Sequence, residues 1–213
     1  MRTLTKELQS AISPSRAIEL LKEGNHRFIN NLKVNRNLLQ QVNETSDGQH
    51  PFAVILSCID SRTSAELIFD QGLGDIFSVR IAGNIINEDI LGSMEFGCKV
   101  AGAKLVLVLG HTKCGAVKGA CDYVEMGNLT TLLNKFHPAL HAETSTIENR
   151  NSKNSEFVEN VAALNVRKSV EAILEKSTIL KEMVEKGEIG IAGAMYDVHT
   201  GDVEFYEDTL KGF

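Results

Sequence analysis

The sequence lacks the features of secreted, membrane-spanning and nucleic-acid-binding proteins. Only four cysteines occur among 213 residues, too few for a disulfide framework in a chain of this length. Basic residues number 22 against 28 acidic ones and no long basic run occurs, which argues against nucleic acid or an anionic membrane surface, because either needs a concentrated positive patch. No apolar run approaches the ~20 residues of a membrane-spanning helix, and the opening residues carry no apolar signal segment.

These absences leave a small molecule or another protein as the partner, and we expect a cytoplasmic location. A hydrophobic content of 43% fits one globular domain that spans residues 1–213. In a reducing compartment, metal binding or catalysis is the better use for some of the cysteines.

Apolar patterns predict an α/β fold with a mostly parallel central sheet flanked by helices. Continuous apolar runs are typical of strands buried on both faces, and helix-like segments alternate with them. The predicted strands are 52–57, 76–81, 104–110 and 189–198, followed by a hairpin at 200–202 into a last strand at 203–206. The predicted helices are 64–70, 89–100, 115–126 and 157–185, the last of them broken near residue 177.

A helical arm is predicted for residues 1–35. Ser13 is a good N-cap and Pro14 suits the first helical position, and apolar side chains recur at helical spacing from Ala17 to Leu32. The sequence allows this arm to contact a neighbouring subunit or to fold onto its own domain. Residues 38–50 are predicted as a polar connection, and 140–155 as a loop or a weak helix.

Two of the predicted strands end in residues that can bind a metal ion. Cys58 ends the first strand, and His111 and Cys114 end the third. Because the carboxyl ends of parallel strands meet at one edge of an open α/β sheet, we expect these three side chains to converge. Two thiolates and one imidazole favour zinc, and three protein ligands leave the fourth tetrahedral position open for catalysis.

Asp60 and Arg62 follow Cys58 on the same strand-end loop and can form a bidentate ion pair. Two thiolates cancel the formal charge of zinc, so a zinc-bound water needs help to react. An Asp60 carboxylate kept ionised by Arg62 can accept a hydrogen bond from zinc-bound hydroxide and aim it at an electrophile. Without Arg62, Asp60 could ligate the zinc instead and switch the site off.

Structural interpretations of the same residues stay open. Cys58 and Cys114 could be a buried thiol pair, and Asp60 with Arg62 could be an ion pair that only ties a loop.

Other candidate motifs lack a residue that their chemistry requires. Ser64 stands where a C-x5-R phosphatase loop needs arginine, and no glycine-rich stretch closes as a phosphate-binding loop. Cys98 and Cys121 lie in apolar helical patterns and are predicted as core thiols. His137 and His141 have the spacing of a helical metal pair, but no carboxylate pattern accompanies them, so we expect a solvated surface.

The residues at the two strand ends resemble the signature of the β-class carbonic anhydrases, C-x-D-S-R followed about fifty residues later by H-x-x-C-G. Here the signature reads Cys58-Ile59-Asp60-Ser61-Arg62 and His111-Thr112-Lys113-Cys114-Gly115. The resemblance extends to four further segments and covers nearly the whole chain. These segments are 24–28, 69–75, 79–84 and 193–198.

The resemblance implies reversible hydration of carbon dioxide to bicarbonate and a proton. It implies one zinc ion per subunit on Cys58, His111 and Cys114, with Asp60 and Arg62 as the catalytic dyad. It further implies a homodimer or a dimer of dimers, in which the opening helix wraps a neighbour and the pocket lies at the seam.

The same resemblance suggests substrate-binding residues. In the plant-like subgroup a glutamine nine positions before the first cysteine lines the pocket, which here is Gln49. Phe77 would present an apolar wall to a linear, nonpolar gas, and Phe96 and Gly115 are also expected at the substrate.

Two departures from the family pattern stand out. Phe96 follows Glu95 where many plant-like members carry tyrosine, so a hydroxyl that could bind bicarbonate is missing. The chain has no tryptophan, which the subgroup with an allosteric bicarbonate site carries, so we expect an open zinc site that Asp60 does not block.

Two other functions remain compatible with the sequence. The same site could act on carbon disulfide or carbonyl sulfide, which are equally linear and apolar. The protein could also be a noncatalytic zinc-dependent scaffold.

Overall fold

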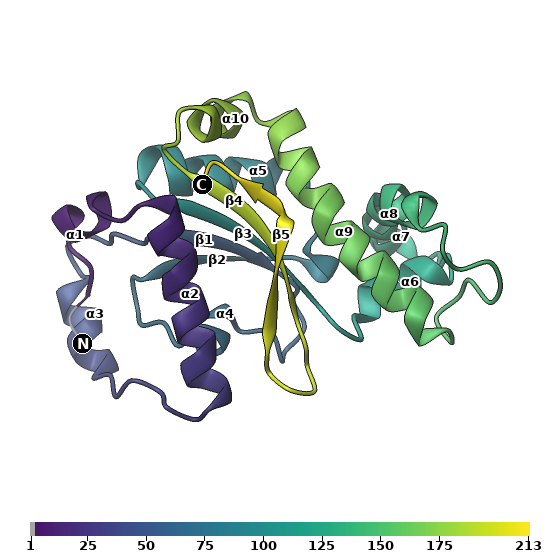
Figure 1. Ribbon diagram of the computed structural model, residues 1–213, viewed down its shortest axis with the longest axis horizontal. Coiled ribbons are helices and arrows are strands. Elements are labelled where there is room, and N and C mark those ends of the chain that lie inside the picture. The colour runs from purple at the N-terminus through teal and green to yellow at the C-terminus, as the bar shows by residue number, and fades with distance from the viewer. Residues whose placement is uncertain (1–2) are drawn as a thin grey trace.

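A five-stranded sheet in the order β2-β1-β3-β4-β5 forms the centre of the computed structural model, which describes residues 3–213 (Figure 1). Strands β1 to β4 are parallel, and β5 pairs antiparallel with β4. The strands are β1 (Ala53–Ser57), β2 (Ile76–Arg80), β3 (Leu105–His111), β4 (Gly190–Tyr196) and β5 (Val203–Lys211). The predicted fold class is therefore confirmed.

Helices cover both faces of this sheet, as Figure 1 shows. The helices are α1 (Lys6–Ser10), α2 (Pro14–Ile29), α3 (Leu38–Glu44), α4 (Ala65–Ile68), α5 (Glu88–Glu95), α6 (Gly115–Cys121), α7 (Gly127–Leu133), α8 (His137–Ala142), α9 (Ser155–Lys176) and α10 (Thr178–Glu185). Short 3-10 turns are η1 (Ala82–Asn84) and η3 (Asn134–Phe136), and a π-helical turn, η2 (Phe96–Val100), continues α5.

Alternate residues of the central strands enter two separate cores. On one face, Ile55 and Leu107 pack with Leu21 of α2 in a fully buried cluster. On the other face, Leu56 and Val108 pack with residues of α9. Because both faces are covered, the central strands are continuous apolar runs, which is the pattern expected for parallel sheets.

The opening helix begins where the sequence predicts it. Ser13 is the N-cap of α2 and its hydroxyl accepts a hydrogen bond from the Arg16 amide, with Pro14 at the first helical position. Its buried side chains pack onto the sheet of the same chain, so α2 folds onto its own domain. The first two residues of the predicted arm lie outside the described residues.

Several element boundaries differ from the sequence prediction. The last strand runs to Lys211, not to residue 206, because β5 keeps pairing with β4 although its outer side chains are polar. Helix α6 ends at Cys121, not at residue 126, since Tyr123 has a φ of +53°. The polar connection at 38–50 contains α3, whose cap Asn37 accepts from the Gln40 amide. The break in the last long helix lies at Ser177, as predicted.

The strand order places a topological switch point between β1 and β3. The chain leaves β1 for β2 on one side, whereas β3 lies on the other side of β1. In open α/β sheets, the loops at the carboxyl ends of the strands diverge at such a point and leave a crevice for ligands. Among residues 3–213, no helix has the length and apolar character needed to cross a membrane.

Candidate metal centre

Three metal-binding side chains meet at this switch point. Cys58 directly follows β1, His111 is the last residue of β3, and Cys114 is the N-cap of α6. Their donor atoms all lie within 4.8 Å of one another, and each side chain is at least 96% buried. The predicted convergence of the three side chains is therefore what the fold produces.

The hydrogen bonds of His111 fix which ring nitrogen faces the cluster. His111 Nδ1 lies 2.9 Å from the carbonyl oxygen of Thr112, and because a carbonyl only accepts, Nδ1 carries the proton. His111 Nε2 is buried and has no hydrogen-bond partner among residues 3–213. A buried nitrogen lone pair without a hydrogen bond costs folding free energy unless an ion binds it. The Nε2 lone pair beside two cysteine sulfurs therefore makes a donor set that fits zinc.

The two cysteines of the cluster are electrostatically different. The neighbouring Cys114 thiol lowers the pKa of Cys58, against the effect of burial. The pKa of Cys114 is raised, first by its interaction with Cys58 and then by burial. The lowered pKa favours the Cys58 thiolate, which is the form that binds zinc.

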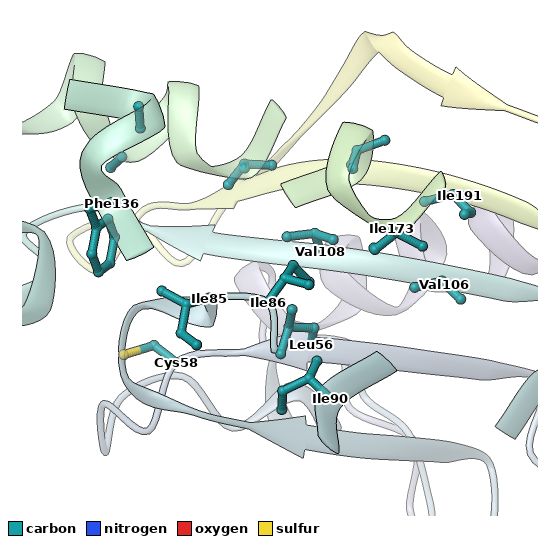
Figure 2. Packing of buried hydrophobic residues seen from close by; sticks show 14 of the residues in the cluster. Leu56, Cys58, Ile85, Ile86, Ile90, Val106, Val108, Phe136, Ile173 and Ile191 are labelled. Atoms are coloured by element: carbon teal, nitrogen blue, oxygen red, sulfur yellow. The ribbon is translucent and has the colours of Figure 1, made fainter. Parts of the chain in front are cut away.

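Gly83 supplies a further donor to the cluster. Its amide donates to the Cys58 sulfur over 3.2 Å, from a backbone with a φ of +67°. A Cβ atom at this position would lie 2.2 Å from the Phe136 ring, so only glycine fits. Figure 2 shows Cys58, Ile85 and Phe136 at the same end of the buried cluster.

Asp60 and Arg62 form the predicted bidentate pair. Arg62 donates from Nε to Asp60 Oδ1 over 2.9 Å and from Nη2 to Oδ2 over 2.8 Å, and its backbone amide also donates to Oδ1 over 3.0 Å. The Arg62 side chain holds the pKa of the Asp60 carboxyl well below its usual range. The carboxylate is thus kept ionised and held by Arg62, and it is not part of the group of three mutually close donor atoms.

Two residues that the sequence interpretation did not single out fix this loop. Arg80, at the end of β2, donates to the carbonyl oxygens of Cys58 over 2.9 Å and of Asp60 over 2.6 Å. The buried Thr63 hydroxyl lies 2.9 Å from each of the same two oxygens. The sequence did contain a signal for Arg80, because this arginine is the last residue of an apolar strand whose carboxyl end lies at the same sheet edge.

Comparison with known proteins identifies the family. The family model described as carbonic anhydrase matches residues 53–203, which includes both strand ends. The chain belongs to the β-class carbonic anhydrase family. Carbonic anhydrase 2 of Mycobacterium tuberculosis is 35% identical over 89% of this chain and 91% of its own length.

Solved structures of the family share the fold. The β-carbonic anhydrase CafA of Aspergillus fumigatus has a TM-score of 0.70 at 28% identity, covering 91% of this chain and 90% of its own. One of two β-carbonic anhydrases of Sordaria macrospora, described as tetrameric, has a TM-score of 0.67 at 23% identity, over 76% and 83% of the two chains. The second likeness concerns the fold alone.

Three of the predicted substrate-binding residues lie at the opposite edge of the sheet. Phe77 pairs with Val54, four residues before Cys58, which corresponds to about 13 Å along a strand. Phe96 packs edge-to-face on Phe77 with ring centroids 6.3 Å apart, and its side chain is 55% exposed. Gln49 precedes β1 and lines a surface hollow that contains none of the three metal ligands. Within one chain, these residues cannot reach the cluster.

The remaining candidates are one glycine next to the cluster and two cysteines in the core. Gly115 begins α6 directly after Cys114, and a Cβ atom on it would meet no atom within 4 Å. Cys98 and Cys121 are buried core thiols, and burial raises the pKa of Cys98 to about 12 and that of Cys121 to about 11. This agrees with their prediction as core residues.

The two histidines with helical spacing lie on a helix. His137 and His141 belong to α8, with Pro138 tolerated in its first turn, and their rings stack with centroids 6.0 Å apart. His141 is exposed, and neither histidine joins the metal-binding cluster.

Proposed function

We propose that this protein catalyses the reversible hydration of carbon dioxide to bicarbonate and a proton. One zinc ion per subunit would be held by Cys58, His111 and Cys114. The observation that carries the proposal is the convergence of these three buried donors beside a carboxylate that is fixed outside the cluster.

Zinc bound by these residues would supply a Lewis acid that makes water a nucleophile near neutral pH. Two thiolates reduce the effective charge of such a centre. The Gly83 amide counteracts this reduction, because its hydrogen bond withdraws electron density from the Cys58 sulfur.

Asp60 is proposed to orient the attacking water. Oδ1 accepts two hydrogen bonds from Arg62, whereas Oδ2 accepts only one and keeps a lone pair available. A water at the site can donate to this lone pair, which fixes one of its protons and leaves an oxygen lone pair directed at carbon dioxide. Arg62 acts by holding the carboxylate ionised and by preventing it from becoming a fourth ligand.

Substrate contacts are proposed to come from two subunits. Gly115 lies beside the cluster of its own chain and lets a substrate approach the backbone closely. Gln49, Phe77 and Phe96 lie at the other sheet edge, so we propose that they line the site of a neighbouring subunit. The aromatic rings would contact carbon dioxide, and the Gln49 amide would bind bicarbonate.

A homodimer or a dimer of dimers follows from this arrangement. The exposed Phe96 ring and the tetrameric description of the Sordaria macrospora protein support it. Light scattering of the purified protein measures the mass, and a monomer at working concentration would contradict it.

A cytoplasmic location is also proposed. Both cysteine ligands must stay reduced to bind zinc, which a reducing compartment ensures. Cell fractionation tests this, and recovery of the protein outside the cytoplasm would contradict it.

Stopped-flow hydration of carbon dioxide with an indicator dye tests the activity. A folded, zinc-loaded sample should accelerate hydration far above the buffer rate, and a rate equal to that of buffer would refute the proposal. Sulfide release from carbon disulfide or carbonyl sulfide at a higher kcat/KM than carbon dioxide hydration would assign the site to those substrates instead.

A further inference from the structure

Two left-handed backbone turns border the metal-binding cluster. Lys113, between His111 and Cys114, has a φ of +57°, and Gly83, whose amide contacts Cys58, has a φ of +67°. For lysine this conformation is strained, because its Cβ atom crowds the following carbonyl oxygen. The turn that sets the spacing of His111 and Cys114 is therefore strained and needs support from elsewhere.

Helix α9 contacts both turns through side chains. The Glu159 carboxylate accepts a hydrogen bond from the Lys113 amide over 2.8 Å, through Oε1. Asn165, which is only 5% exposed, donates from Nδ2 to the Gly83 carbonyl oxygen over 3.1 Å. A single rigid helix thus holds the backbone on two sides of the cluster.

We propose that Glu159 and Asn165 are positioning residues that preorganise the cluster for zinc. This rests on the proposed zinc site of the previous subsection. Glu159 keeps Lys113 in the left-handed conformation that brings the His111 nitrogen and the Cys114 sulfur to one ion. Asn165 keeps the Gly83 amide directed at the Cys58 sulfur.

A positioning role of Glu159 and a role in simple attachment of α9 lead to different expected effects of a mutation. If Glu159 only anchors the helix, removing it costs stability whatever residue stands at position 113. If Glu159 opposes strain at Lys113, a glycine at that position should make it largely dispensable, because glycine adopts positive φ without a Cβ penalty.

The first experiment is a double-mutant cycle on zinc affinity, measured by competition with a chromophoric chelator. Glu159→Ala should weaken zinc binding about tenfold, the lower end of the range for outer-shell partners of metal ligands. Glu159→Gln should recover most of this loss, because its amide oxygen can still accept from the Lys113 amide. In a Lys113→Gly background, Glu159→Ala should cost less than about threefold. Glu156→Ala, an exposed change in the first turn of α9, is the matched control.

The second experiment concerns Asn165. Asn165→Asp keeps the size of the side chain but places a carboxylate against the Gly83 carbonyl, so zinc affinity should fall about tenfold. Asn160→Asp on the same helix is the control, because the Asn160 side chain donates to the Ser145 hydroxyl over 3.3 Å and not to the Gly83 carbonyl. In the cobalt-loaded protein, the sulfur-to-cobalt charge-transfer band should shift in Asn165→Asp and not in Asn160→Asp.

Two results would overturn the proposal. One is zinc affinity within about twofold of wild type in both Glu159→Ala and Asn165→Asp. The other is an equal loss from Glu159→Ala with lysine or glycine at position 113, which would assign it to attachment of the helix. Failure of the proposed function looks different, because the wild-type protein itself would then fail to bind zinc or to hydrate carbon dioxide.

Discussion

The two edges of the central sheet hold their candidate functional residues in different ways. At the carboxyl edge, Cys58, His111 and Cys114 are buried. The surrounding backbone holds two of them, because the Gly83 amide donates to Cys58 and the Thr112 carbonyl accepts from His111. At the amino edge, Gln49 and Phe96 are exposed. The contrast shows that one chain completes a metal-binding cluster, whereas Gln49 and Phe96 lie away from it, and this is why we propose that they serve another chain.

The largest effect is expected from removing a sulfur donor at the carboxyl edge. Cys58→Ser should abolish stoichiometric zinc binding and reduce carbon dioxide hydration to the buffer rate, because an alcohol is a far weaker zinc ligand than a thiolate. Elemental analysis and stopped-flow hydration measure the two losses. Cys98→Ala, which removes a buried thiol outside the cluster, should keep one zinc per subunit. Full metal content in Cys58→Ser would show that the ligand assignment is wrong.

The next largest effect is expected at the carboxylate of the same edge. Asp60→Asn should retain zinc but lower kcat/KM about 100-fold, since an amide donates where the water needs an acceptor. Metal analysis beside the hydration assay separates binding from catalysis. An unchanged kcat/KM in this variant would show that Asp60 has no catalytic role and would leave Asp60 and Arg62 as a structural ion pair.

The comparison between edges is tested most directly by mixing subunits. Gln49→Ala should lower kcat/KM about tenfold with zinc retained, the worth of one hydrogen bond of ~1.4 kcal/mol. Co-assembly of Gln49→Ala with Asp60→Asn subunits should give more activity than the average of the separate variants, because one site then has both residues intact. Gln40→Ala, on the exposed surface of α3, is the control. An activity equal to the average would mean that Gln49 does not act across subunits.

The smallest effect on activity is expected from a polar cluster outside both edges. Burial would raise the pKa of the Glu143 carboxyl, but hydrogen bonds from Ser145, Thr146 and Arg150 outweigh it and lower the pKa to about 2. Because the folded pKa lies below the unfolded value of 4.5, Glu143 stabilises the fold above pH 4.5. This contribution is lost as the pH falls from about 4.5 toward 2.

Urea unfolding of Glu143→Gln measures this contribution. The variant should lose about 2 kcal/mol near pH 7 and show a smaller difference from wild type near pH 3. Its kcat/KM at neutral pH should match wild type. A stability difference that does not change with pH would show that the charge of Glu143 is not what stabilises the loop.

The strands that carry the cluster were predictable because strands buried on both faces are continuous apolar runs in the sequence. The apolar runs that became β1 and β3 are buried on both faces, so no polar position interrupts them and their ends could be read closely. The far end of β5 was not predictable, because Glu207 and Asp208 face outward on an edge strand and resemble a loop. Helix α3 was hidden for the same reason, since most of its side chains are exposed.

Residue types and spacing alone determined the chemistry of this protein: two cysteines and a histidine at strand ends, with a carboxylate and an arginine that are close in sequence. The interaction of Asp60 with Arg62 is local in the sequence, so it could be predicted without knowledge of the fold. Only the tertiary structure decided that Gly83, Arg80 and helix α9 support the cluster, and that Gln49 and Phe96 lie away from it. Those relations join segments distant in the chain, and strand order and helix orientation set them, which no short pattern of residues records.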